Sequence, residues 1–527
     1  MIKPSKRERL TAFLRDPSSY PHRPATVRST ETHISWVFFA SPFVFKVKKP
    51  VNFGFLDFSS LERRHHFCQR EIELNRRLAP EIYCGVLPIY RKGETFSFEP
   101  NSEVTEYCVQ MKELRDGYFL HQLLEQGLVS AREISQVISL LHRLYDAAPT
   151  FPKTEGWGTP EKLRITTDEN LALAEKFVGN AVTVGALAAI RLFTDSFYQQ
   201  RSDLLNERVQ QDRIRDCHGD LRLEHIHLTP ESTSIFDCIE FNDRLRFIDT
   251  ANDLAFLAMD FDFAGRRDLG NQLLETASRE FCDPGLPKVT DFYKCYRAAV
   301  RGKVESLEAE SCAAAQAIKH INLAKRYFRL ALRYATCGSK PTILVVMGPV
   351  ASGKSTIARE LASELGWPVF SSDRTRKILA NIPLTERTDA TDRARVYSEK
   401  MTTLTYERLL VGSIAALTQE GGVVLEATFS RRVHRELLMR ECAKANASLQ
   451  IIELDVHQDE TRARLKRRDK SGNEISDARL EDFEKLTAGY DPPVEIGPDL
   501  IKISTAASIP ENVKRVLLEM AKRQTDR

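Results

Sequence analysis

The chain has 527 residues, of which 42% are hydrophobic and 28% are charged, and its formal net charge at pH 7 is +3. A chain of this length is too long to fold around a single hydrophobic core, so two to four domains are expected. The small net charge gives no bulk electrostatic reason to expect nucleic acid or an anionic membrane as partner. The ten cysteines form no C-x-x-C pair, and no apolar stretch reaches the roughly 20 residues that span a bilayer. We therefore expect a cytoplasmic protein without structural zinc, a disulfide framework or membrane contact.

The first 335 residues predict two structural parts. Residues 30 to 115 show short alternating strands and one helix at 61 to 78, whereas residues 130 to 335 look mostly helical. A strand-turn region at 214 to 249 interrupts the helices. We expect one part at 1–115 and another at 116–335.

The strand-turn region carries the sequence His-Gly-Asp-Leu at 218 to 221, with His225 shortly after it and Glu240 beyond a further strand. It resembles the H-G-D-L-x-x-x-N-I catalytic loop of aminoglycoside and choline phosphotransferases, which share the protein-kinase fold. The resemblance implies a two-lobe fold with lobes at 1–115 and 116–335. It implies that Asp220 is the base or orients the acceptor hydroxyl, and that Glu240 binds metal.

The same resemblance extends to the strands upstream. It implies that Lys46 contacts nucleotide phosphates and that Glu71, on the following helix, pairs with it. Choosing Lys46 over the neighbouring Lys48 and Lys49 rests on strand register alone. The chain departs from the family pattern at His225, which stands where a metal-binding Asn is usual, and residues 28 to 45 hold no glycine-rich loop. Imidazole is a poor Mg²⁺ ligand. Turnover at this site and ligand binding without turnover therefore both stay open.

A linker is predicted at 336–341, and it separates the first 335 residues from a unit at 342–527 of the size of a P-loop domain. Directly after it, the apolar run at 343 to 347 leads into Gly348 to Ser355, which reads G-x-x-x-x-G-K-S, and then into a helix at 356 to 365. Strand, glycine loop and helix are the context of a phosphate-binding P-loop. Backbone N–H groups and the helix N-terminus cradle phosphate there. We expect ATP to bind Gly348, Ser352, Gly353, Lys354, Ser355 and Thr356, with Ser355 also on Mg²⁺.

Two later strand ends carry further polar groups. Asp373 follows the strand at 367 to 372 and begins D-x-x-R with Arg376, and Glu426 lies near the end of the strand at 422 to 429. Ligands of open α/β sheets bind at the C-terminal ends of strands. Asp373 is therefore predicted to accept the proton of an acceptor hydroxyl, although capping of the next helix is an alternative. Arg376 is predicted to hold the acceptor or balance phosphate charge, and Glu426 resembles the Walker-B carboxylate that holds Mg²⁺ through water.

A basic helix at 461 to 468 looks like the lid of small-molecule kinases, and its candidate phosphate ligands are Arg464, Arg467 and Arg468. A solvated helix face is the alternative. Residues 342 to 500 resemble the P-loop kinase group that includes polynucleotide kinase, gluconate kinase and zeta-toxin-like proteins. The whole chain resembles bacterial bifunctional aminoglycoside phosphotransferase/ATP-binding proteins, with an AAA-type P-loop domain of parallel α/β/α sheet architecture following the kinase-like domain.

These features predict an ATP-dependent phosphotransferase acting on a hydroxyl of a small molecule, with the better-supported ATP site in the C-terminal part. One alternative is an ATP-binding regulatory protein whose N-terminal domain is degenerate. Another is a nucleic-acid end kinase, suggested by D-x-x-R, against which the near-neutral charge and the lack of a basic stripe argue.

Overall fold

The computed structural model describes the chain except residues 1–4, 55, 101–102, 149–156, 472–474 and 527, together with the side chains at 390–391, 468–471, 482 and 485–487. The described chain forms two compact units, and both are discontinuous in sequence. The first contains Met1–Ile165 and Asp203–Tyr293, and the second contains Thr166–Ser202 and Lys294–Arg527. The linker predicted at 336–341 does not mark this division, because two earlier segments group with the C-terminal unit.

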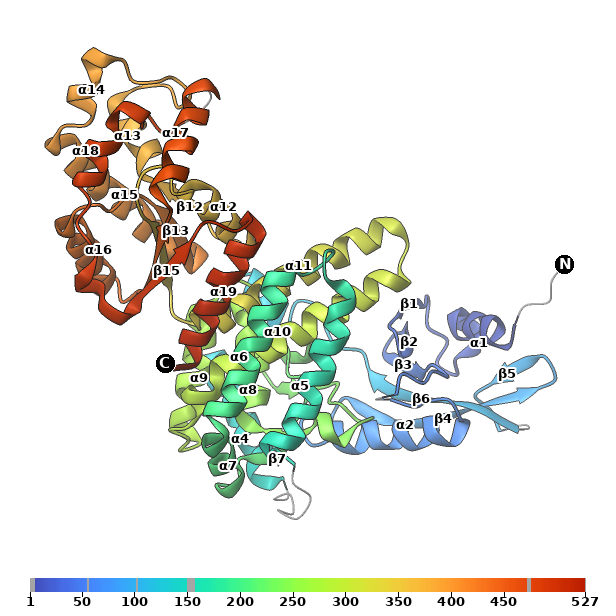
Figure 1. Cartoon of the computed structure of the whole chain (residues 1–527). Coiled ribbons are helices and arrows are strands. Elements are labelled where there is room, and N and C mark those ends of the chain that lie inside the picture. Colours follow the sequence, from blue (N-terminus) through green and yellow to red (C-terminus); the bar gives the residue numbers. More distant parts are fainter. Residues whose placement is uncertain (1–4, 55, 101–102, 149–156, 472–474, 527) are drawn as a thin grey trace. The chain divides into compact units, whose positions relative to one another are not determined.

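A six-stranded antiparallel sheet, in the order β1-β2-β3-β6-β4-β5, organises the start of the first unit (Figure 1). Its two faces are covered by different helices, because neighbouring strand residues point to opposite faces. Leu14 of α1 packs with Phe45 on one face, and Ile72 of α2 packs with Val109 on the other. The elements are α1 (Lys6–Arg15), β1 (Arg28–Glu31), β2 (Ser35–Ala40), β3 (Phe43–Lys48), α2 (Leu61–Asn75), β4 (Tyr83–Lys92), β5 (Thr95–Ser97) and β6 (Glu103–Lys112).

The rest of the first unit is mainly helical, with two short antiparallel strand pairs, β7–β10 and β8–β9. The pair β7–β10 precedes and follows the His-Gly-Asp segment and so fixes both ends of the loop region. Its elements are α3 (Leu120–Glu125), α4 (Ala131–Ala147), α7 (Ser202–Gln210), β7 (Ile214–Asp216), β8 (Ile226–Leu228), β9 (Thr233–Ile235), β10 (Phe247–Asp249), α8 (Thr250–Phe263) and α9 (Arg267–Glu280). Two helices run from one unit into the other, α5 (Pro160–Ala174) and α10 (Leu286–Ser311).

A five-stranded sheet of parallel strands, in the order β12-β13-β11-β14-β15, forms the centre of the second unit. This confirms the predicted parallel α/β domain. The elements are β11 (Thr342–Met347), α12 (Lys354–Leu365), β12 (Val369–Ser371), α13 (Ser372–Ala380), α14 (Ala390–Val396), α15 (Glu399–Glu420), β13 (Gly422–Glu426), α16 (Arg432–Lys444), β14 (Ser448–Asp455), α17 (Gln458–Ser471), α18 (Phe483–Ala488), β15 (Leu500–Ser504) and α19 (Ile509–Asp526).

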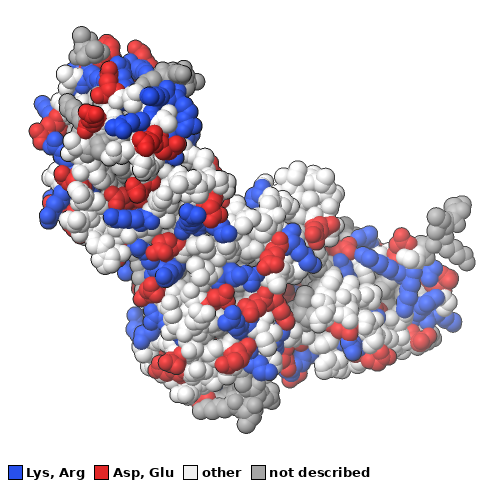
Figure 2. Space-filling model, in the orientation of Figure 1, with Lys and Arg blue, Asp and Glu red and all other residues white. Residues whose placement is uncertain are grey.

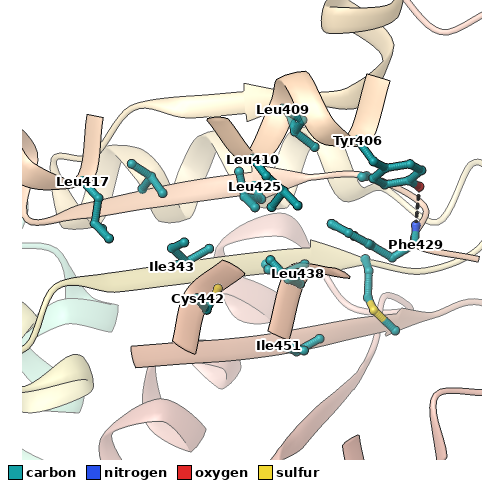
Figure 3. Close-up of a cluster of buried hydrophobic side chains, with 14 of the residues drawn as sticks. Ile343, Tyr406, Leu409, Leu410, Leu417, Leu425, Phe429, Leu438, Cys442 and Ile451 are labelled. Atoms are coloured by element: carbon teal, nitrogen blue, oxygen red, sulfur yellow. Dashed lines mark hydrogen bonds between the residues drawn. The ribbon is translucent and has the colours of Figure 1, made fainter. Parts of the chain in front are cut away.

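One face of this sheet packs on α15 and α16 (Figure 3). Leu410 from α15 and Leu438 from α16 meet Ile343 and Leu425 of the central strands in one buried cluster. The central strands β11 and β13 are buried on both faces, as their continuous apolar runs predict for a covered parallel sheet. This packing holds the ends of β11 and β13, from which the candidate site is built.

The helices α6 (Val184–Gln200) and α11 (Ala314–Cys337) belong to the same unit because they pack against α19. Leu517 of α19 lies beside Gly185 at the start of α6, where an added Cβ would be 3.5 Å from a Leu517 methyl carbon. The contacts between α6 and α19 join residues more than 300 positions apart, so local sequence patterns do not reveal them. Within the described ranges, every helix is either too short or too polar to cross a membrane.

Candidate functional site

The loop between β11 and α12 has the backbone of a phosphate-binding turn. Gly348 has φ +141°, Ala351 φ +59° and Gly353 φ +95°. A Cβ at Gly348 would lie 2.5 Å from the carbonyl oxygen of Leu454 on the neighbouring strand, which leaves no room for a side chain. The loop therefore needs glycine at 348 for space as well as for conformation.

Two side chains of this loop point toward its interior. The Lys354 Nζ donates a hydrogen bond of 2.7 Å to the Pro349 carbonyl oxygen across the loop. The Ser352 hydroxyl is buried and has no hydrogen-bond partner among the described residues. A buried hydroxyl without a partner costs free energy, so this atom fits a loop completed by a ligand. Gly353 and Thr356, which were also predicted to contact ATP, lie at the start of α12.

A carboxylate and two hydroxyls meet beside the loop. Glu426, at the end of β13, accepts hydrogen bonds from the Ser355 hydroxyl at 3.1 Å and from the Ser371 hydroxyl at 2.7 Å. Burial, together with the nearby Asp373 carboxylate, raises the pKa of Glu426 above its ordinary value. Hydroxyl and carboxylate oxygens are the donors that Mg²⁺ prefers, so Ser355 and Glu426 fit the ion that accompanies a nucleotide.

No group of three or more potential metal-ligating side chains occurs in the part of the chain that the structure describes. This is compatible with Mg²⁺ at a nucleotide site, because that ion is usually held by one or two protein groups plus phosphates and water.

The D-x-x-R residues lie on α13, directly after β12. Asp373 is in the first turn of the helix and is partly exposed. Arg376 is buried, with its guanidinium 4.9 Å from the ring of Tyr397. The cap residue of α13 is Ser371, so the alternative role predicted for Asp373, an N-cap, does not occur. Tyr397 was not a sequence candidate, because it lies between two helices in a segment without apolar periodicity.

The three predicted lid arginines differ in their surroundings. Arg464 of α17 donates to the Ala351 carbonyl at 3.3 Å, which brings it to the P-loop, and it pairs with Glu460 at 2.9 Å. Arg467 also pairs with Glu460 and is largely exposed. The side chain of Arg468 lies outside the described residues.

The first unit holds a second group of charged side chains, which gathers around the inner strand β3 of its antiparallel sheet. Lys46 Nζ lies 2.9 Å from Glu71 and 2.6 Å from Asp237. Lys48 Nζ lies 2.6 Å from the other oxygen of Glu71 and contacts Glu240. Glu71 thus pairs with both lysines, so the choice between them is not exclusive.

Glu240, which was predicted to bind metal, belongs to this group. Its side chain is buried against Lys48, with an exposed fraction of 5%, and burial raises its pKa, with Lys48 acting in the opposite direction. A third carboxylate of the group is Asp237, which pairs with Lys46. The sequence analysis did not identify it. Burial opposes its ionisation, yet Lys46 and His225 hold the pKa of Asp237 well below its ordinary value. Its position just after β9 was an available signal.

The His-Gly-Asp segment faces Asp237. His225 lies between two acids, with Nδ1 3.6 Å from an oxygen of Asp220 and Nε2 3.7 Å from an oxygen of Asp237. The backbone N–H groups of His218 and Gly219 donate to Asp253 at 3.0 and 2.9 Å. This carboxylate of α8 therefore fixes the loop that presents Asp220.

Three kinds of comparison bear on these sites. Residues 343–493 match the AAA domain family. Over 422 residues the chain is 31% identical to the uncharacterized proteins Rv2004c of Mycobacterium tuberculosis and Mb2027c of Mycobacterium bovis, and each match covers 79% of this chain and 80% of the relative. A stretch of 63 residues is 38% identical to cytidylate kinase of Bordetella pertussis, covering 12% of this chain and 28% of that enzyme.

Solved structures similar to part of the chain include a gluconokinase from Sinorhizobium meliloti, with 20% identity and a TM-score of 0.25, covering 35% of this chain and 94% of that one. Another is the Mycobacterium tuberculosis APS kinase in complex with AMPPNP and APS, with 22% identity and a TM-score of 0.25, covering 34% of this chain and 98% of that one.

Proposed function

The chain belongs to the same family as these mycobacterial proteins, and we propose that it is a phosphotransferase that moves the γ-phosphoryl group of ATP to a hydroxyl group of a small molecule. The observation that carries the proposal is the P-loop itself, with Lys354 and the Ser355–Glu426 pair beside it. The match of residues 343–493, which contain this loop, to the AAA domain family supports nucleotide binding there.

Each residue of the site has a task in this reaction. Loop amides and Lys354 bind the polyphosphate, and Ser355 with Glu426 would hold Mg²⁺, which neutralises phosphate charge when bound. The acceptor oxygen bonds to the γ-phosphorus as the bond from that phosphorus to the β–γ bridging oxygen breaks. Asp373 takes the hydroxyl proton, and ADP leaves. Arg464 and Arg467 bind the transferring group from the lid.

We propose a small-molecule acceptor and a cytoplasmic location. On the face shown in Figure 2, Lys and Arg are interspersed with Asp and Glu, and this pattern does not favour a nucleic-acid end kinase. A basic stripe would be expected if a polyanion ran across that face.

For the N-terminal unit we propose an aminoglycoside phosphotransferase-like, two-lobe site. The Lys46–Glu71 pair on β3 and α2 supports it, together with Asp220 and Asp237 opposite. Asp237 is a better candidate for a metal ligand than Glu240, because the Glu240 carboxylate is already in an ion pair with Lys48. The alternative is a regulatory role in which this unit binds a ligand without turnover, which His225 in place of an oxygen ligand favours.

The proposed function is tested with γ-labelled ATP and a mixture of small hydroxyl compounds. Lys354→Ala is expected to reduce ATP affinity of the C-terminal site at least tenfold and to abolish labelled product, because the ammonium group on the phosphates is lost. Lys444→Ala is the control, since that lysine is exposed and pairs with Glu441 on the same helix. Unchanged ATP binding in Lys354→Ala would exclude this site, and tight binding without any labelled product would favour regulation.

A further inference from the structure

Arg376 is a buried cation that forms no ion pair with any carboxylate among the described residues. Its exposed fraction is 8%, and its Nη1 donates only to uncharged oxygens, at 3.1 Å to the Val396 carbonyl and at 3.1 Å to the Thr402 hydroxyl. Its Nε is buried and has no acceptor in the part of the chain that the structure describes. In the described part of the chain no carboxylate forms an ion pair with it.

Such an arginine is unusual on physical grounds. A charge removed from water is costly unless it is paired and hydrogen-bonded, and buried arginines are normally matched by a carboxylate. The same chain shows the usual arrangement at Arg208, which is bound by both Asp249 and Asp283. The Tyr397 ring, 4.9 Å from the Arg376 guanidinium, offsets part of the cost through its π face. Among the described residues, no ion pair offsets the rest of this cost.

The place of Arg376 shows what kind of group would compensate it. Arg376 follows Asp373 by three residues on α13, so the two side chains lie on one helix face about 5–6 Å apart at Cβ. Asp373 is the proposed proton acceptor, at the C-terminal end of β12. Tyr397, whose side chain also contacts Asp477 at 3.0 Å, keeps an exposed fraction of 41% beside them.

We propose that the acceptor is an anion, and that its carboxylate or phosphate group binds the Arg376 guanidinium while its hydroxyl meets Asp373. The inference rests on the proposed phosphotransferase function and specifies its substrate class. A neutral polyol or a free sugar would leave the buried guanidinium unpaired and would bind poorly. The acceptor is expected to carry its anionic group within about one helical turn of the reacting hydroxyl.

The first test uses the full-length chain without any ligand. Arg376→Met removes an uncompensated buried charge and keeps most of the side-chain volume, so its melting temperature is expected to equal or exceed that of the wild type, by up to about 4 °C. Arg374→Met, on the exposed side of the same helix, is the matched control and should leave it unchanged. A lower melting temperature for Arg376→Met would overturn the proposal, because Arg376 would then act through its bonds to Val396 and Thr402.

The second test measures anion binding directly. Inorganic phosphate is titrated into full-length protein saturated with AMPPNP and Mg²⁺. The wild type and Arg374→Met are expected to bind phosphate alike, and Arg376→Met at least tenfold more weakly. Arg376→Lys should have an intermediate affinity, because an ammonium group keeps the charge but lacks the paired N–H donors of a guanidinium. Equal phosphate affinity in wild type and Arg376→Met would overturn the proposal.

The third test compares acceptors that differ in one group: glycerol with glycerate and glycerol 3-phosphate, and glucitol with gluconate. Labelled product is expected from anionic members only, and Arg376→Met should raise their KM at least tenfold while the KM for ATP stays unchanged. Comparing glycerate with glycerol 3-phosphate shows whether the site prefers a carboxylate or a phosphate group on the acceptor. Equal use of the neutral members overturns this inference while leaving the proposed function intact. Loss of ATP binding in the wild type itself would instead refute the proposed function.

Discussion

At the scale of single residues, Gly348 is the P-loop position that tolerates a side chain least. An alanine there meets the Leu454 carbonyl oxygen, which is backbone and cannot rotate away. Gly348→Ala is expected to destabilise the second unit by about 1–3 kcal/mol and to lower ATP affinity more than tenfold, because the loop must shift.

Gly497→Ala is the matched control for this prediction. Gly497 also has a positive φ, +61°, but a Cβ there would meet nothing within 4 Å. Denaturant unfolding followed by titration with a fluorescent ATP analogue separates the two effects. A similar loss in both variants would mean that conformation alone, and not contact with Leu454, fixes glycine at 348.

Glu426 makes stability depend on pH. Its pKa in the folded chain is raised above the ordinary value, so the folded state holds a proton over a range in which the unfolded state has lost it. The contribution to stability is full below the unfolded pKa of 4.5 and is lost as pH rises through the folded value. Glu426→Gln is expected to flatten this part of the stability–pH curve and to weaken Mg²⁺-dependent ATP binding. Unfolding measured from pH 4 to pH 8 checks it, and an unchanged slope would contradict the assignment.

At the scale of elements, the C-terminus of α12 depends on another helix. Arg333 of α11 donates to the carbonyls of Leu365 at 2.6 Å and Gly366 at 2.8 Å. These oxygens have no partner within α12, as expected at a helix end. Arg333→Ala is expected to destabilise the second unit by about 1–3 kcal/mol. Hydrogen exchange in the last turn of α12 should rise, because the contact is lost there. ATP affinity should change less than threefold, because the P-loop lies at the other end of the helix, which begins at Lys354.

The strand-loop-helix around the P-loop could be predicted because its signals are local. Gly348 and Gly353 need their conformations whatever surrounds them, and the flanking apolar run predicts a covered strand. Lys46 and Lys48 could not be separated, because residues two apart in a strand share a face, and Glu71 indeed contacts both. Asp237 was missed because it lies in an irregular segment, at φ +63°, where no periodicity guides the choice between it and Glu240.

At the scale of the whole molecule, the boundary predicted at 336–341 separates residues that the structure keeps together. The compositional change at Gly338 to Pro341 is real, but it follows α11, which packs on α12 and α19. Domain membership depends on contacts between α6 and α19, which a reading of local composition does not include. The second unit therefore needs a segment from the middle of the chain.

This discontinuity leads to a prediction about truncation. A fragment of residues 342–527 has the complete parallel sheet and the P-loop, but it lacks α6 and α11, against which α19 packs. The buried side chains of α19 include Val516, Leu517 and Met520. Each is worth about 1.5–3 kcal/mol when fully buried, so their partial exposure is comparable with the whole stability of a domain.

The fragment is accordingly expected to aggregate or to unfold at lower denaturant concentration than the second unit of the full chain, and to bind ATP at least tenfold more weakly. Size-exclusion chromatography, urea unfolding and titration with a fluorescent ATP analogue measure these properties. Replacing Leu517, Val516 and Met520 by Gln in the fragment restores solubility if exposed apolar surface is the cause. A fragment that is monomeric, as stable as the full chain and equal to it in ATP affinity would show that α6 and α11 are accessory to the P-loop domain.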